Sequence, residues 1–190
     1  MAKIPIFQDS IILDSLIDTQ LDETIYKVLK NEIEKKEGSF FSNKGGYQTV
    51  SINNEKICNT ILNKSVKMIT ENYRIFNSNF TMNALWINQN KKGNYNSPHI
   101  HPLSVFAGVY YLNVAETGGD LIFFRSDRSN QMLDINKDFI DEDFNAEYHL
   151  RPLKNQIILF PSNLVHMVSA HFDDKPRISV SFNISITKNG

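Results

Sequence analysis

Cysteine is almost absent from this 190-residue chain, which contains only Cys58 and therefore cannot form an intrachain disulfide. A lone cysteine suits a reducing compartment, and its apolar, helix-like surroundings favour a small buried residue over a reactive thiol. Long hydrophobic runs are also missing. No stretch is long enough to span a bilayer, and the first residues lack the sustained apolar segment of a secretory signal. We therefore expect a cytoplasmic protein.

A surplus of charge of either sign is missing too. The chain has 20 Lys and Arg against 21 Asp and Glu, which gives a formal net charge of −1. This balance argues against a broad electrostatic attraction to nucleic acid or to an anionic membrane. The short basic run Lys91-Lys92 is typical of a solvated loop. We expect neither nucleic acid nor a membrane as a partner.

The first eighty residues predict two helices. Apolar residues recur at helical spacing from about Leu21 to Lys36, and Gly38 follows as a plausible stop. A second helical pattern runs from about Asn54 to Asn72. Between them, the segment 42–47 reads Ser-Asn-Lys-Gly-Gly-Tyr, which is typical of a turn or loop.

From about Phe80 the pattern changes to short strands separated by turn residues. Their number and spacing indicate a jelly-roll or barrel-like fold, so the expected class is α+β and mainly β. We expect one domain over residues 1–190, with residues 1–79 as a mainly helical support and residues 80–190 as the β core. The polar, acidic stretch Ser126–Glu147 lacks strand periodicity and is a candidate lid or substrate loop. The predicted strands are Thr81–Asn88, His99–His101, Val105–Asn113, Asp120–Phe124, Tyr148–Arg151, Gln156–Phe160, His166–Ala170 and Arg177–Thr187.

The last of these strands has two distinct faces. Between Arg177 and Thr187 the even positions are apolar and most odd positions are polar, and side chains alternate across a strand. The apolar face suits packing against the helices. The polar face either meets solvent or lines a cavity, and the periodicity leaves both readings open.

His99 and His101 lie two residues apart, so on an extended strand both imidazoles point the same way. With one residue between them, they can chelate a single metal ion. His166 is the best candidate for a third ligand, because it follows a predicted strand and the turn Pro161-Ser162-Asn163. Three imidazoles leave positions open on an octahedral ion for a co-substrate and O₂. A short histidine pair alone also arises on surfaces and in hydrogen-bonded cores.

Arg177 follows His166 by eleven residues, and Ser179 comes two residues later. If the two strands are antiparallel neighbours, Arg177 projects into the same cavity, deeper than the metal. A guanidinium there makes a fixed bidentate site for a carboxylate. A dicarboxylate such as 2-oxoglutarate would chelate iron at one end and meet Arg177 at the other, with Ser179 assisting. The alternative is a surface ion pair of Arg177 with Asp173 or Asp174.

Several short segments follow one another along residues 80–187. They are His99-Ile-His-Pro, Gly108-Val-Tyr-Tyr-Leu-Asn, Gly118-Gly-Asp-Leu, Leu159-Phe-Pro, His166 and Arg177-Ile-Ser-Val-Ser-Phe-Asn. Their order and spacing resemble the core of prolyl-hydroxylase-type 2-oxoglutarate/Fe(II) oxygenases. Segment 42–47 also resembles a small subfamily of oxygenases found in bacteria and phages. The resemblance implies a double-stranded β-helix that uses Fe(II), 2-oxoglutarate and O₂.

The resemblance also assigns roles to residues. It implies that His99 and His166 are iron ligands and that Arg177 anchors the far carboxylate of 2-oxoglutarate. The first tyrosine of the Tyr-Tyr-Leu-Asn segment, Tyr110, is implied to hydrogen-bond the co-substrate. Its neighbour Tyr111 faces the other way and is expected in the core.

The chain departs from the family pattern at one ligand. The usual pattern is His-x-Asp or His-x-Glu, and His101 stands at the carboxylate position. A neutral imidazole there raises the net charge of the iron site by one unit. Two alternatives are that His101 does not bind, or that Asp120 approaches from a neighbouring strand. We favour His101, because its spacing from His99 fits the ligand position.

These residues predict an Fe(II)- and 2-oxoglutarate-dependent oxygenase, with His99, His101 and His166 as the catalytic metal site. We expect it to hydroxylate a small-molecule or peptide substrate with release of succinate and CO₂. One alternative is a cupin-like three-histidine dioxygenase that does not use 2-oxoglutarate, and another is a non-catalytic β-sandwich binding module. Trp86 and Asn88 are further candidates for the pocket lining. The two histidines at positions 149 and 171 lack ligand spacing and are expected to be structural or at the surface.

Overall fold

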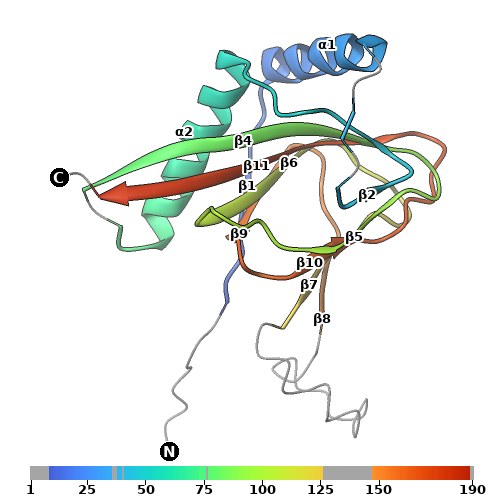
Figure 1. Ribbon diagram of the computed structural model, residues 1–190. Coiled ribbons are helices and arrows are strands. Elements are labelled where there is room, and N and C mark those ends of the chain that lie inside the picture. Colours follow the sequence, from blue (N-terminus) through green and yellow to red (C-terminus); the bar gives the residue numbers. More distant parts are fainter. Residues whose placement is uncertain (1–8, 36–37, 40, 76, 126–146, 189–190) are drawn as a thin grey trace, which may run out of the picture.

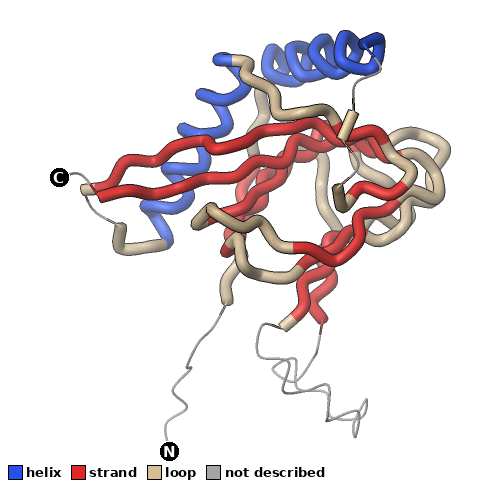
Figure 2. Tube along the Cα trace, in the orientation of Figure 1, coloured by secondary structure: helices blue, strands red, loops and turns tan. Residues whose placement is uncertain are grey.

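The computed structural model describes residues 9–35, 38–39, 41–75, 77–125 and 147–188. These residues form three layers: two helices cover one face of a six-stranded sheet, and a five-stranded sheet lies against its other face (Figures 1 and 2). No helix in the described part of the chain is both long and apolar enough to cross a membrane.

Both sheets are antiparallel throughout. The larger sheet has the order β1 (Ile12–Ser15), β9 (Gln156–Pro161), β6 (Phe106–Asn113), β11 (Arg177–Lys188), β4 (Ser78–Asn90) and β3 (Tyr47–Gln48). The smaller sheet has the order β2 (Asn43–Lys44), β5 (Tyr95–His99), β10 (His166–Val168), β7 (Leu121–Phe124) and β8 (Glu147–Leu150). Two facing antiparallel sheets of this kind form a double-stranded β-helix, or jelly roll. The predicted fold class is confirmed.

The two helices form where the sequence predicts them. α1 spans Thr19–Lys35 and α2 spans Glu55–Asn72, each within two residues of its predicted ends. α2 begins after Asn54, whose side chain accepts a hydrogen bond from the backbone N–H of Ile57 at 3.1 Å. The apolar faces of both helices pack into one core with the larger sheet. The helices therefore support the sheet on the face opposite the cavity described below.

β11 carries the two faces predicted from its alternation. The apolar residues from Ile178 to Ile184 pack into the core shared with the helices. Arg177, Ser179 and Ser181 point the other way and line a cavity between the sheets. Of the two readings left open by the sequence, the cavity is therefore correct. Phe182 needs glycine as its neighbour on β6, since a Cβ at Gly108 would lie 2.3 Å from its ring.

Three local predictions need correction or fall outside the description. Segment 42–47, predicted as a turn or loop, contains β2 and the first of the two residues of β3, because it pairs with a strand of each sheet. The predicted strand 99–101 ends at His99, and the backbone N–H of His101 donates to Ser162 O at 2.8 Å rather than to a strand ladder. Of the proposed lid, residues 126–146 lie outside the described residues.

Candidate active site

Three histidines converge in the cavity between the sheets. His99 ends β5 and His166 begins β10, and the two are direct partners across these antiparallel strands. His101 follows two residues after His99, where the chain turns back toward the cavity. One ring nitrogen of each residue lies within 4.8 Å of the others, and His101 Nε2 lies 3.2 Å from His166 Nε2. This is the grouping predicted from the sequence.

Backbone carbonyls orient two of the three rings. His99 Nδ1 lies 2.8 Å from Ser97 O, and His166 Nδ1 lies 2.9 Å from Leu164 O. Because a carbonyl only accepts, each Nδ1 must carry the proton, which leaves the Nε2 lone pair for a metal. The His101 ring stacks on Trp86, with a centroid distance of 5.6 Å and an interplanar angle of 26°.

The three rings are neutral at physiological pH. Burial lowers the pKa of His166 to about 3 and of His101 to about 4, and the nearby His99 adds to both shifts. Burial also lowers the pKa of His99. A metal therefore meets unprotonated nitrogen donors, and protons do not compete for them near pH 7. Three imidazoles with open positions suit Fe(II).

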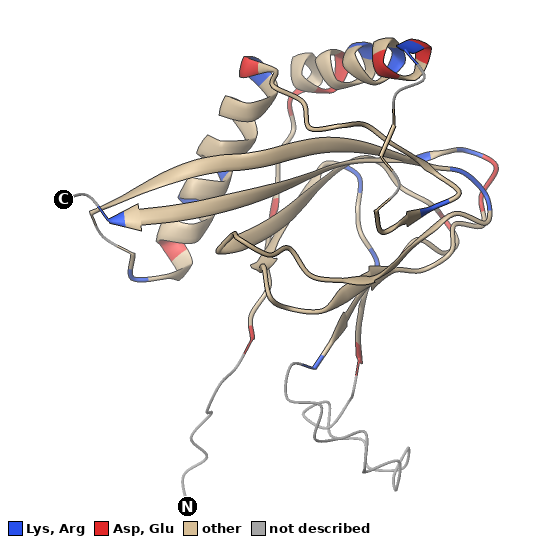
Figure 3. Cartoon of the chain, viewed as in Figure 1, with Lys and Arg blue, Asp and Glu red and all other residues tan. Residues whose placement is uncertain are grey.

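Arg177 supplies a positive charge to the same cavity. Its exposed fraction is 2%, and it is the one Lys, Arg, Asp or Glu side chain buried in the described part of the chain. Figure 3 shows other charges mainly on helices, loops and strand ends. Its guanidinium donates to Asn90 Oδ1 at 3.1 Å, Asn96 Oδ1 at 3.5 Å and Gly119 O at 3.4 Å, while its buried Nε has no hydrogen-bond partner. Among the described residues, no carboxylate pairs with it.

The alternative of a surface ion pair for Arg177 is therefore wrong. Asp173 instead accepts hydrogen bonds from the Thr117 hydroxyl and the Glu116 backbone N–H. Asp174 lies 3.4 Å from Lys92. Burial lowers the pKa of Arg177, which reflects the cost of holding a cation without an anionic partner. A bound carboxylate would offset that cost.

The cavity itself is narrow, with a volume of about 40 Å³. It contains the predicted lining residues Trp86, Asn88 and Ser179 beside the histidines and Arg177. The full lining comprises Trp86, Asn88, Asn96, His99, His101, Gly108, Val109, Tyr111, Leu121, Phe160, His166, Val168, Arg177, Ser179 and Ser181. The histidine cluster and the guanidinium therefore face the same cavity.

Tyr110 does not reach this space, contrary to the prediction. It faces the helices, is fully buried in their core, and donates its hydroxyl to Asp22 Oδ1 at 2.6 Å. Tyr111 points into the cavity instead, because successive residues of β6 face opposite sides of the sheet. Burial raises the pKa of Tyr111 to about 12, although the nearby Arg177 opposes the shift, so its hydroxyl remains a donor.

The other candidates have structural roles. Asp120, considered as an alternative ligand, pairs with Arg151 at 2.5 Å and is not in the histidine cluster. His149 pairs with Glu147 at the surface. His171 is buried, and its Nε2 lies 2.6 Å from Lys175 O.

Sequence reasoning missed several polar residues near the site. Ser42 Oγ lies 3.5 Å from His99 Nε2 and accepts a hydrogen bond from Asn96 at 3.3 Å. Asn90 and Asn96 hold Arg177, as described above. An asparagine or serine in a strand carries no local signal of such contacts. Only the strand register brings residues this distant in sequence together.

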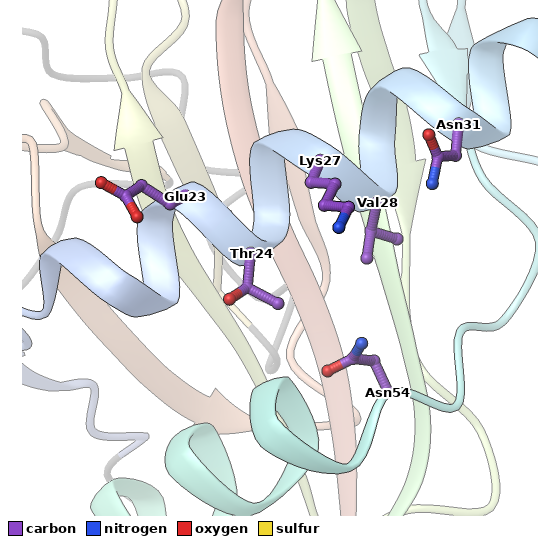
Figure 4. A pocket seen from close by; sticks show the side chains of 6 residues that line it. All are labelled: Glu23, Thr24, Lys27, Val28, Asn31 and Asn54. Atoms are coloured by element: carbon purple, nitrogen blue, oxygen red, sulfur yellow. The ribbon is translucent and has the colours of Figure 1, made fainter.

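A second and larger hollow, of about 460 Å³, lies between α1 and the start of α2 (Figure 4). Its lining is Glu23, Thr24, Lys27, Val28, Asn31 and Asn54. These side chains are on the helical layer, and none belongs to the histidine cavity. Although this hollow is the larger of the two, it contains neither the histidines nor Arg177, so it is not the candidate active site.

The family assignment agrees with this geometry. The family model described as "Putative 2OG-Fe(II) oxygenase" matches residues 84–183, which is more than half of the chain. The chain therefore belongs to this family of 2-oxoglutarate- and Fe(II)-dependent oxygenases and is an oxidoreductase. The predicted cofactors, Fe(II) and 2-oxoglutarate, are those of the family. A search of curated proteins finds no match to the sequence.

Solved structures share the fold at low sequence identity. A prolyl-4-hydroxylase from Pseudomonas putida has a TM-score of 0.62 at 13% identity, covering 96% of this chain and 94% of its own. A viral collagen prolyl hydroxylase from Paramecium Bursaria Chlorella virus-1, in its 2-oxoglutarate complex, has a TM-score of 0.60 at 16% identity, covering 92% and 94%. HygX from Streptomyces hygroscopicus, with nickel and 2-oxoglutarate bound, has a TM-score of 0.63 at 8% identity, covering 93% and 83%.

Proposed function

We propose that this oxygenase hydroxylates an organic substrate while converting 2-oxoglutarate and O₂ to succinate and CO₂. The observation that carries the proposal is a buried Arg177 without a carboxylate partner, facing the same narrow cavity as three neutral histidines. His99, His101 and His166 would hold Fe(II). When bound, the iron would supply the chemistry that activates O₂.

The protein's own residues bind and orient the co-substrate. Arg177 offers a fixed fork of donors to the far carboxylate of 2-oxoglutarate. Ser179 lies two residues along the same face of β11 and lines the same cavity. We assign the hydrogen bond first predicted for Tyr110 to Tyr111, whose side chain faces the cavity. The burial of these groups excludes bulk water and strengthens their electrostatic contacts.

The substrate is proposed to be a small molecule or a peptide that contacts the rim beside His101. Two apolar side chains close to His101 in the sequence are exposed: Ile100 is 45% exposed and Leu103 is 95% exposed. Leu103 also has a φ of 64°, which is costly for a residue with a branched side chain.

An anaerobic titration tests the proposed function. Purified protein is titrated with Fe(II) and then with 2-oxoglutarate, while the visible spectrum is followed for a metal-to-ligand charge-transfer band. We expect the band to saturate at one iron per chain and to be absent from a His166→Ala variant. Succinate should then form when O₂ is admitted. Iron binding without a band would favour the cupin-like dioxygenase, and no iron binding would favour the non-catalytic module.

The two neighbouring tyrosines provide a matched pair of variants. Tyr110→Phe removes the hydrogen bond to Asp22, so we expect a loss of roughly 1 kcal/mol in unfolding free energy and unchanged 2-oxoglutarate affinity. Tyr111→Phe should weaken 2-oxoglutarate binding instead. Chemical denaturation and calorimetric titration measure the two quantities. The reverse result would return the co-substrate role to Tyr110.

A further inference from the structure

A chain of amide side chains starts at the guanidinium of Arg177. Arg177 donates to Asn90 Oδ1, and Asn90 Nδ2 donates to Asn43 Oδ1 at 3.2 Å. Asn43 Nδ2 then donates to Asn88 Oδ1 at 3.4 Å. Asn88 Nδ2 donates to the Ser181 hydroxyl oxygen at 3.0 Å. Because a guanidinium only donates, it fixes the direction of every hydrogen bond in this chain.

A second, shorter branch leaves the same guanidinium. Arg177 donates to Asn96 Oδ1, and Asn96 Nδ2 donates to Ser42 Oγ. Asn90, Asn96 and Asn43 are 0%, 7% and 2% exposed, so solvent does not reorganise around them. The amide oxygens are the partners that hold Arg177 in place.

The turn between β2 and β3, which links the two sheets, packs closely against this network. A Cβ at Gly46 would lie 2.5 Å from Asn43 Oδ1 and 2.9 Å from Asn90 Nδ2. Glycine therefore lets the backbone approach the two amides. The network thus depends on a close approach built into the fold, and it is not an incidental surface cluster.

All of these partners are neutral. A buried arginine is ordinarily paired with a carboxylate, because an unpaired buried charge is costly. Here neutral oxygens satisfy three of its hydrogen bonds and leave its charge uncompensated among the described residues, with Nε lacking any partner. Such a site retains its electrostatic attraction for an anion that enters from the cavity.

We propose that Asn90 and Asn96 are positioning residues that hold Arg177 without neutralising it, and so select 2-oxo acids that carry a second carboxylate. The inference rests on the proposed function, in which Arg177 meets the far carboxylate of 2-oxoglutarate. It extends that function by assigning co-substrate selectivity to neutral amides whose hydrogen bonds go to Arg177, Asn43 and Ser42 and not to the three histidines.

The test places a carboxylate beside Arg177 with almost no change in shape. In Asn96→Asp the Ser42 hydroxyl can reverse its hydrogen bond and donate to the new carboxylate, so this variant should fold normally. Asn90→Asp puts the charge closer to Arg177 but removes the donor to Asn43. The nearby guanidinium keeps either aspartate ionised. Asn79→Asp, at an exposed position of the same strand β4, is the matched control.

Binding of 2-oxoglutarate and of pyruvate, a 2-oxo acid without the far carboxylate, is measured anaerobically by calorimetry on the Fe(II)-loaded protein. We expect 2-oxoglutarate affinity to fall by about tenfold or more in both Asn90→Asp and Asn96→Asp, because the internal ion pair competes with the ligand. Pyruvate affinity should change little, and Asn79→Asp should match the unmodified protein.

Each other outcome overturns the inference in a different way. Unchanged 2-oxoglutarate affinity in Asn96→Asp would show that the charge of Arg177 is not being preserved for a ligand. Equal losses for 2-oxoglutarate and pyruvate would show a merely structural role for the amides. Failure of the unmodified protein to bind 2-oxoglutarate would instead overturn the proposed function, and the inference with it.

Discussion

A His101→Ala variant is expected to lose stoichiometric iron binding, while His101→Asp retains it. His101 Nε2 lies 3.2 Å from His166 Nε2 and belongs to the three-histidine cluster. Removing it leaves two nitrogen donors. We expect the iron dissociation constant to rise by at least about 100-fold, since even outer partners of metal ligands are worth 10–100-fold. Equilibrium titration with Fe(II) under anaerobic conditions measures the change.

The aspartate variant tests whether residue 101 coordinates the metal or only lies near it. An aspartate at position 101 restores the His-x-Asp pattern and lowers the charge of the metal site by one unit. It should bind Fe(II) at least as tightly as the unmodified protein, because a carboxylate adds charge attraction to coordination. If His101→Ala binds one iron with unchanged affinity, His101 is not a ligand. Circular dichroism of both variants controls for loss of the fold.

Replacing Arg177 with methionine is expected to produce the second large effect. Methionine keeps much of the length and volume of the side chain but removes its charge and all its donors. Losing one partner of a buried charged pair costs about 3–5 kcal/mol. We therefore expect 2-oxoglutarate affinity to fall by roughly 100-fold or more, whereas Fe(II) affinity should remain unchanged.

Arg177→Lys separates charge from geometry. Lysine keeps the positive charge, but it replaces the planar fork of donors with a single ammonium group. Its 2-oxoglutarate affinity should lie between that of the methionine variant and that of the unmodified protein. Calorimetric titration of the iron-loaded variants gives the three values. Equal affinity in all three would exclude Arg177 as the anchor of the co-substrate.

The sequence predicted the parts of the site that depend on local periodicity. The alternation along β11 places side chains on one face of a strand, and the short spacing of His99 and His101 brings both rings to the cavity although the strand ends at His99. The cavity reading of that alternation and the grouping with His166 are confirmed by the structure. The two helices could also be predicted from the sequence, because their apolar periodicity extends over several turns.

The parts that depend on long-range register could not be predicted in the same way. Tyr110 and Tyr111 are adjacent, so an error of one residue exchanges the core for the cavity. The Asn43 amide reaches Asn88 and Asn90 only because β2 and β3 attach to different sheets. Two-residue strands of this kind have no periodicity to detect. Tertiary pairing, rather than local preference, decides their conformation.

The direct pairing of His99 with His166 also has a mechanical consequence. With one cysteine, the chain lacks the covalent cross-link that a disulfide would provide. A metal held by His99, His101 and His166 would tie the end of β5 to the start of β10, and it would join His101 to His166, which lie 65 residues apart in the sequence. It would act as a reversible staple across the smaller sheet, one that forms only when distant strands have met and that a chelator can release.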